Sequence, residues 1–408
     1  MIVRALRWMV AVVTLLALAA PARPAAAQGG TELVLGALVD KSSNLLVDLT
    51  LTIAEREINA YLLGQNQPYR VRIVQEDVGK DPQRALAAVQ RLAAQGIRVI
   101  IGPETSEQAA AVLPYANANG IVLISYASTA TSLAIPGDNL FRLIADDSQQ
   151  AAALTAYVID SGVTTIVPLI RDDVFGNDFV EQFTLAFRAA GGTVEPAVRY
   201  DPAATSFAEP LQALNSRVDA AARRAGSEKV GVLLVAFEEV VPIFDAALEY
   251  PALVSVRWYG TDGTAEVLAL VDNPRAAQFA VTVDFPNSVY GEEGSLEHYD
   301  QVASQVRAQT GLAPSNVALI AYDAVFVAAL AAAVAGGVSN VDAYKAALVT
   351  TAAAYTGVTG RTVLNAAGDR DFGDYDFYAV RDIGGSYAWV RVARYTAEPE
   401  SGAGFARR

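Results

Sequence analysis

The stretch from Arg98 to Leu133 constrains the fold more than any other part of the chain. It contains two short apolar runs, Val99–Ile101 and Ile121–Ser125, separated by a segment with apolar residues at helical spacing. Apolar runs of this length on either side of a helix predict neighbouring parallel strands of an α/β sheet. Each run ends in a turn rich in small and hydroxyl-bearing residues, which places those turns at the carboxyl edge of the predicted sheet.

The same alternation of strand and helix extends along most of the chain. The predicted strands are 32–39, 69–75, 140–144, 165–170, 194–200, 230–235, 256–259, 278–283, 361–364, 375–381 and 387–394. The predicted helices are 45–63, 82–95, 149–160, 177–190, 207–225, 238–250, 296–310, 315–335 and 341–350. A chain of 408 residues is long for one hydrophobic core, so two lobes are expected.

We therefore predict an α/β fold of two doubly wound parallel-sheet lobes. The predicted first lobe comprises residues 31–145 and 284–360, and the second comprises 146–283 and 361–395. Residues 396–408 have no apolar pattern and are predicted to be a flexible tail.

Residues 1–27 read as a secretory signal peptide. Arg4 and Arg7 precede an apolar run, Trp8–Ala20, that is too short for an ordinary membrane span. Ala25-Ala26-Ala27 supplies a small-residue cleavage site. The chain contains no cysteine, so neither a lipid anchor on cysteine nor a disulfide is possible. We expect a periplasmic or secreted product that is soluble after cleavage.

Charge and residue content exclude several classes of function. The formal net charge of −14 argues against binding to nucleic acid or to anionic lipid surfaces. The one histidine, His298, lies in what reads as an exposed helix start, so a Ser-His-Asp triad is not expected. A hydrolase is a weaker alternative, because acid pairs such as Glu238 and Glu239 have no nucleophile–base constellation with them. We predict no enzyme activity, no cofactor and no metal site.

The two turns after the central strands are candidates for anion binding. Ser106 begins a helix after the first of these strands, and Thr129 lies in the turn after the second. Helix amino termini present unpaired backbone N–H groups, and hydroxyls add donors, so the two turns could hold one carboxylate. Serine and threonine are also preferred helix caps, and the two roles are compatible.

Several motifs, taken in order, resemble one family. They are AEREINA, DPQRALAAVQRL followed by GIRVIIGP, GPETS, ISYASTATSL, DVFG, YGTDG, AYDAV and GRTVLNAAGDRD. Over nearly all of residues 31–395 the chain resembles the type I periplasmic binding proteins of the branched-chain amino acid (Leu/Ile/Val) class. The resemblance implies lobes joined by three crossovers and a cleft that closes on a small ligand.

The resemblance also implies roles for particular residues. The ligand carboxylate maps to Ser106, Ser128 and Thr129, the ammonium to Asp262, and the aromatic cover to Phe175 and Phe237. From the residues alone, the role of Asp262 in an Asp-Gly turn is favoured over ligand contact, and both phenylalanines equally fit a lobe core. Phe175 stands where the family usually has tyrosine, and the 40–44 loop departs from the common form, so the ligand choice stays open.

The function implied is that of a solute-binding protein. It would capture a small amino acid-like ligand and deliver it to the permease and ATPase subunits of an ABC importer. The alternative is a ligand-sensing receptor module for an amide or an aromatic carboxylate. We expect a monomer.

Overall fold

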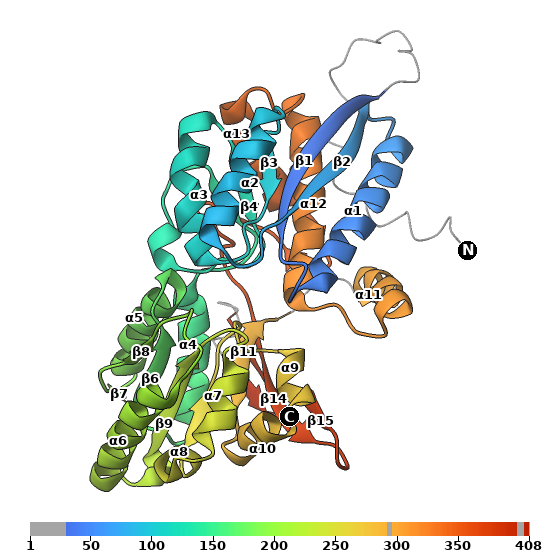
Figure 1. Cartoon of the computed structure of the whole chain (residues 1–408). Coiled ribbons are helices and arrows are strands. Elements are labelled where there is room, and N and C mark those ends of the chain that lie inside the picture. The colour runs from blue at the N-terminus through green and yellow to red at the C-terminus, as the bar shows by residue number, and fades with distance from the viewer. Residues whose placement is uncertain (1–29, 292–295, 398–403, 408) are drawn as a thin grey trace.

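The computed structural model describes residues 30–291, 296–397 and 404–407. It contains two lobes, which lie one above the other in Figure 1. The predicted signal peptide, residues 1–27, lies outside the described residues.

The first lobe is built on a five-stranded parallel sheet of order β2-β1-β3-β4-β5. Buried side chains of α1, α12 and α13 pack on one face, and those of α2 and α3 on the other, so the sheet is doubly wound as predicted. The strands are β1 (Thr31–Val39), β2 (Tyr69–Asp77), β3 (Val99–Ile101), β4 (Val122–Ser125) and β5 (Leu140–Arg142). The helices are α1 (Leu45–Gly64), α2 (Pro82–Ala94), α3 (Ser106–Asn119), α11 (Leu296–Thr310), α12 (Asn316–Ala335) and α13 (Val341–Ala354), with a 3₁₀ turn at Thr131–Leu133.

The second lobe is built on a parallel sheet of order β10-β9-β6-β7, in which β8 also pairs with β6. Side chains of α4 and α5 pack on one face and those of α6, α7, α8 and α10 on the other. The strands are β6 (Thr165–Arg171), β7 (Thr193–Val194), β8 (Val198–Tyr200), β9 (Val230–Val235) and β10 (Arg257–Tyr259). The helices are α4 (Asp147–Asp160), α5 (Val174–Ala189), α6 (Ala208–Ala225), α7 (Val240–Ala247), α8 (Pro251–Val254), α9 (Leu268–Asp272) and α10 (Pro274–Thr282), with a 3₁₀ turn at Ser227–Lys229.

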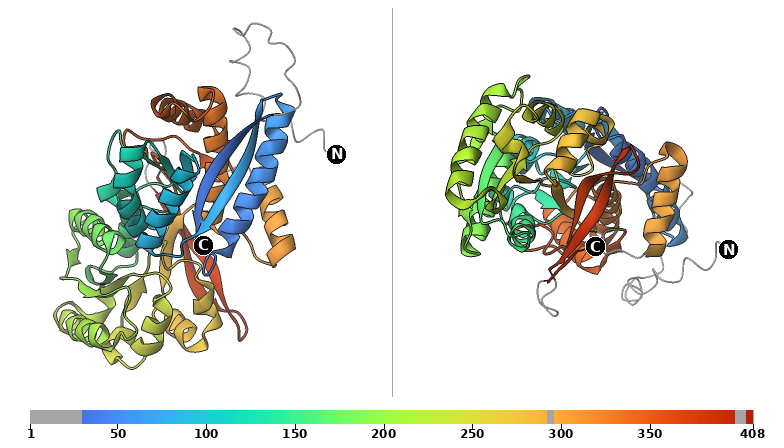
Figure 2. Two further views of the ribbon diagram at one scale, coloured as in Figure 1. Left: turned by 45° about the horizontal axis from the view of Figure 1, so that its top comes forward. Right: turned by 90° about the horizontal axis from the view of Figure 1, so that it is seen from below.

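A third sheet, antiparallel and of order β11-β14-β15-β16, completes the second lobe. Figure 2 shows the hairpin of this sheet, β14 and β15, in red. It also shows that α11 lies beside α1, although the two helices are far apart in sequence. The strands are β11 (Pro286–Tyr290), β14 (Tyr375–Asp382), β15 (Tyr387–Thr396) and β16 (Gly404–Arg407), and a separate hairpin joins β12 (Thr356–Gly357) to β13 (Gly360–Arg361). The chain crosses between the lobes after β5, after β11 and after β13.

The structure corrects several sequence predictions. Residues 278–283 are not a strand, because Asn273 caps the amino terminus of α10 and Pro274 occupies its first turn. Its buried residues, which include Phe279, then repeat at helical spacing. The predicted strand 194–200 is two short strands interrupted at Pro196, and β13 stops at Arg361.

The boundaries between the lobes also differ from the prediction in particular residues. Phe285, predicted in the first lobe, packs in the core of the second lobe. Leu364, predicted in the second lobe, packs in the core of the first. Within the predicted loose tail, Gly404–Arg407 pairs with β15. In each case contacts distant in sequence decide the placement.

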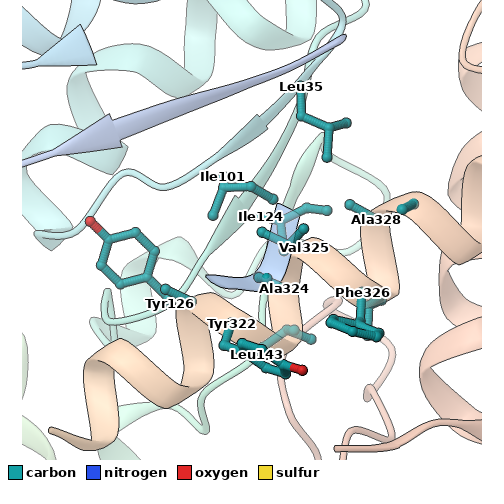
Figure 3. Close-up of a cluster of buried hydrophobic side chains, with 14 of the residues drawn as sticks. Leu35, Ile101, Ile124, Tyr126, Leu143, Tyr322, Ala324, Val325, Phe326 and Ala328 are labelled. Atoms are coloured by element: carbon teal, nitrogen blue, oxygen red, sulfur yellow. The ribbon is translucent and has the colours of Figure 1, made fainter. Parts of the chain in front are cut away.

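Helix α12 is the centre of the first-lobe core. Figure 3 shows its side chains Val325 and Ala328 facing Ile124 of the sheet, with Tyr126 at the edge of the cluster and its hydroxyl directed away from it. Among the described residues α12 alone is long and apolar enough to cross a membrane, and most of it is buried inside the protein. Burial on both sides explains an apolar composition all round the helix.

Buried ionic contacts hold the crossovers together. Arg142, at the end of β5, donates two hydrogen bonds to Asp369 at 2.5 and 2.6 Å, and both side chains are at most 1% exposed. Arg370 donates to the carbonyl of Leu143 at 3.1 Å and lies 4.7 Å from the ring centroid of Tyr290. These contacts link the first and third crossovers to the end of β11.

Candidate functional site

The turns at the carboxyl ends of the strands meet where the lobes touch. Lys80, after β2, forms an ion pair of 2.6 Å with Glu238, after β9. Glu107, in the first turn of α3, accepts a hydrogen bond of 3.0 Å from the backbone N–H of Val174 in α5. In Figure 1, α3 lies directly above α5 at this junction. The residues that the sequence assigns to ligand binding lie in these turns, as expected for a parallel α/β sheet.

Ser106 and Thr129 are brought together by the two central turns of the first lobe. The Ser106 hydroxyl oxygen accepts hydrogen bonds of 3.2 Å from the backbone N–H groups of Thr129 and Ala130. Thr105, not Ser106, caps the helix, in a reciprocal capping box with Gln108. The Ser106 oxygen thus accepts hydrogen bonds from the same backbone N–H groups that could bind a ligand carboxylate. The hydroxyl proton of Ser106 remains available to donate to another acceptor.

Ser128 carries a buried hydroxyl with no hydrogen-bond partner among the described residues. The residue is 1% exposed. Its backbone N–H donates to the Ser125 hydroxyl at 3.0 Å, and its carbonyl accepts from Arg142 at 3.3 Å. Backbone contacts therefore fix the position of Ser128, and its buried hydroxyl remains available to form a hydrogen bond.

Asp262, after β10, is a half-buried carboxylate in the second lobe. One oxygen accepts a hydrogen bond of 2.9 Å from the backbone N–H of Gly263. Burial raises the pKa of Asp262 to about 6, although hydrogen bonding from Gln150 opposes that rise. A carboxylate held in this way gains from a cation placed beside it.

Asp147, the first residue of α4, was not among the predicted site residues. It is fully buried, and neither carboxylate oxygen has a hydrogen-bond partner within the described residues. Burial raises the pKa of Asp147 well above its ordinary value, and the charge of Asp262 raises it further. The nearby Thr129 hydroxyl lowers this pKa, though it lies outside normal hydrogen-bond geometry.

The sequence did not identify Asp147 as a candidate site residue, because Asp146-Asp147-Ser148 resembles an ordinary helix start. Asp146 is the cap, since its side chain accepts from the Ser148 backbone N–H at 3.0 Å. One feature of the sequence could have identified Asp147: it follows β5 closely, and residues that follow parallel strands lie at the carboxyl edge of the sheet. The structure brings it close to Asp262, so two acids of the second lobe, one at the start of α4 and one after β10, lie within electrostatic reach of each other.

Phe175 and Phe237 stack against each other, with ring centroids 5.5 Å apart and planes within 2° of parallel. Phe175 is buried in the core of the second lobe. The Phe237 ring also receives the Arg171 guanidinium at 3.8 Å and the Lys80 ammonium at 4.7 Å from its centroid. Phe237 thus contacts one aromatic ring and two cations, while Phe175 belongs to the second-lobe core.

The arrangement is suited to binding a small polar molecule. It offers one buried and one half-buried acid for a cationic group, and hydroxyls and amides for an anionic one. No group of three or more metal-ligating side chains occurs within residues 30–291, 296–397 and 404–407. His298 lies elsewhere, with its Nε2 3.3 Å from the Tyr322 hydroxyl between α11 and α12.

Comparison with known proteins finds relatives similar in sequence to this chain. The chain is 27% identical over 350 residues to an uncharacterised protein of Methanocaldococcus jannaschii, covering 81% of this chain and 82% of that one. It is 28% identical over 160 residues to the Leu/Ile/Val-binding protein BraC3 of Rhizobium johnstonii, covering 39% of this chain and 40% of the relative.

Solved structures show the same fold. A leucine-binding protein LivK of Thermotoga maritima superimposes with a TM-score of 0.72 at 16% identity, covering 88% of this chain and 97% of the other. A solute-binding protein of R. palustris in complex with benzoate superimposes with a TM-score of 0.68 at 18% identity, covering 88% and 96%. The resemblance seen in the sequence is confirmed, and so is the two-lobed α/β fold. Because the model of the receptor family ligand binding region matches residues 46–382, the chain belongs to that family, whose members are ligand-binding proteins and receptors rather than enzymes.

Proposed function

We propose that the protein is an extracytoplasmic solute-binding protein that captures an amino acid-like ligand between its lobes. The observation that carries the proposal is the pair of acids Asp147, which is buried, and Asp262, which is half-buried: they come from different strand-end turns, and no ion pair of the described residues includes either of them, although the charge of Arg142 acts on Asp147. A ligand ammonium between them would supply the missing positive charge. Because Asp262 comes from the second lobe and Thr129 from the first, such a ligand favours the closed arrangement of the lobes.

The ligand carboxylate would bind at the two turns of the first lobe. It would replace the Ser106 oxygen as the acceptor for the N–H groups of Thr129 and Ala130, which are now held at 3.2 Å. Ser106 and Ser128 would then donate their hydroxyl protons to it, which also satisfies the unpaired Ser128 hydroxyl. Charge-assisted hydrogen bonds of this kind are stronger than neutral ones.

Phe175 and Phe237 would form the apolar wall beside the ligand. The same stacked pair favours the second candidate, a receptor for an aromatic carboxylate, since a flat ring can stack on a flat ring. The related R. palustris structure is a complex with benzoate, which supports keeping this alternative. An aromatic acid has no ammonium, however, and would leave Asp147 and Asp262 without a partner.

Delivery to the permease and ATPase subunits of an ABC importer is the proposed use of the captured ligand. The supporting observations are the relatives named as Leu/Ile/Val-binding proteins and the solved structures named as ABC transporter proteins. We further propose that residues 1–27 direct export, that the mature chain acts in the periplasm and that it is monomeric.

The test is calorimetric titration of amino acids into the protein and three variants. Thr129→Ala keeps the backbone N–H but removes the Thr129 hydroxyl, which would also donate to the ligand carboxylate; such a hydrogen bond to a charged group is worth about 1.5–3 kcal/mol, so binding should weaken roughly tenfold or more. Asp262→Ala removes one of the two acids beside the ligand ammonium, and removing one partner of a buried charge pair costs about 3–5 kcal/mol, so its loss should be larger. The control Asp172→Asn changes an acid that is 54% exposed on the neighbouring β6 turn and should bind normally.

Binding by Asp262→Ala at wild-type affinity would contradict an α-amino acid ligand. The aromatic carboxylate alternative would then be the better account, and benzoate should bind the wild type more tightly than any amino acid. Small-angle scattering with and without ligand gives an independent readout, because closure of the lobes on the ligand should reduce the radius of gyration.

A further inference from the structure

Glu104 has only weak partners although it lies in the ligand turn, two residues before Ser106. Its Oε1 accepts from Asn44 at 3.3 Å, and its Oε2 lies 3.5 Å from the Tyr126 hydroxyl. That hydroxyl makes the shorter bond of 3.0 Å to the carbonyl of Leu38. The ion pairs formed by the described residues do not include Glu104, and the cation that acts on it, Lys80, is paired with Glu238.

The surroundings of Glu104 are negatively charged. Burial raises the pKa of Glu104, and Lys80 only partly offsets that effect, while Asp40 and Glu238 add to it. Asp40 is 2% exposed, and although burial opposes its ionisation, hydrogen bonds from Ser42 and Ser43 lower its pKa. Two acids and one lysine therefore act on Glu104, and that lysine is already paired across the lobes with Glu238.

Unpartnered buried groups in the adjoining turns point independently to a bound polar molecule. The Ser128 and Thr261 hydroxyls and both oxygens of Asp147 are buried without partners among the described residues, and these three residues are at most 1% exposed. The contact between Ser106 and the Thr129 amide joins the turn of Glu104 to the turn of Ser128. A ligand that uses these groups would therefore reach toward Glu104.

We propose that Glu104 determines specificity and selects an amino acid with a cationic side chain, such as lysine, ornithine or arginine. The inference rests on the proposed function, because the α-ammonium and α-carboxylate must occupy the other turns. A side-chain cation would give Glu104 a direct charge partner besides Lys80, which acts on Glu104 but is ion-paired with Glu238. An aliphatic side chain would cover Glu104 and remove water from an unpaired carboxylate, which opposes binding.

Matched pairs of amino acids test the charge directly by calorimetry on the full chain. L-arginine is compared with L-citrulline, and L-lysine with L-norleucine, because each pair has nearly the same shape and differs in charge. A hydrogen bond to a charged group implies that the cationic member binds roughly ten- to a hundredfold more tightly. Glu104→Gln should reduce this ratio to a few-fold, and Glu104→Leu should shift the preference toward L-leucine.

The control Glu76→Gln removes another acid of the first lobe, one paired with Arg91 at 2.6 Å, and should leave the ratio unchanged. Thermal unfolding of each variant verifies that it is folded. Equal affinities within both pairs, with no change in Glu104→Gln, overturn the inference while the amino acid-binding function stands. If no amino acid binds the wild type, the proposed function fails, and this inference fails with it.

Discussion

Removing Asp369 is the most demanding test of how this fold is held together. Asp369 is 1% exposed and accepts two hydrogen bonds from Arg142, which is fully buried. In Asp369→Ala the guanidinium would remain buried with only the carbonyls of Ser128 and Ala130 as acceptors, at 3.3 and 2.8 Å. Breaking a buried pair in this way costs about 3–5 kcal/mol.

Urea unfolding measures this loss. With an m value of about 3 kcal/mol/M, the midpoint should fall by about 1 to 1.7 M at unchanged m. The matched control is Asp219→Ala, which breaks a surface pair with Arg223 four residues away on one helix. Exposed pairs of this spacing contribute about 0.3–0.5 kcal/mol, so its midpoint should hardly move.

Equal midpoints for Asp369→Ala and Asp219→Ala would refute the reasoning, because they would mean that burial adds nothing to the energy of the pair. A large loss in Asp369→Ala should also weaken ligand binding, since Arg142 holds the carbonyls of the turn that contains Ser128. Binding can be measured at a urea concentration where both variants are still folded.

Four further predictions concern Asp262, Lys80 and Gly357. The pKa of Asp262 in the folded protein is about 6, against an ordinary value of 3.8, so the folded state binds the proton more tightly than the unfolded state. The free energy of unfolding should therefore fall as pH rises from about 4 to 6. In thermal unfolding, Asp262→Asn should show a smaller dependence of stability on pH. A ligand ammonium favours the ionised acid, so calorimetry should show affinity rising between pH 5 and 7. Lys80→Met removes the 2.6 Å ion pair with Glu238 that joins the lobes, so the radius of gyration of the free protein should increase in small-angle scattering. The loss of stability should be small, because exposed ion pairs contribute about 0.2–1 kcal/mol. A Cβ at Gly357 would lie 2.1 Å from an Asp323 oxygen, so Gly357→Ala should lower the melting temperature, and a melting point equal to wild type would contradict the packing there.

The sequence by itself determined the layout of the fold. The alternation of apolar runs and helical segments predicts both parallel sheets, because strand and helix periodicity are local properties. Local capping also predicts α2, where Asp81 accepts from the N–H groups of Gln83 and Arg84 and Pro82 occupies the first turn. The same pattern places Ser106 and Thr129 at one sheet edge, and the structure brings them to a 3.2 Å contact.

Only the tertiary structure decided which charges are paired and which are left alone. Arg142 and Asp369 are 227 residues apart, and Lys80 and Glu238 are 158 apart, so no local pattern links them. Asp147 looks like a helix-start residue until folding buries it beside Asp262. The cost of burying a charge depends on every group around it, and those groups come together only when the lobes have folded.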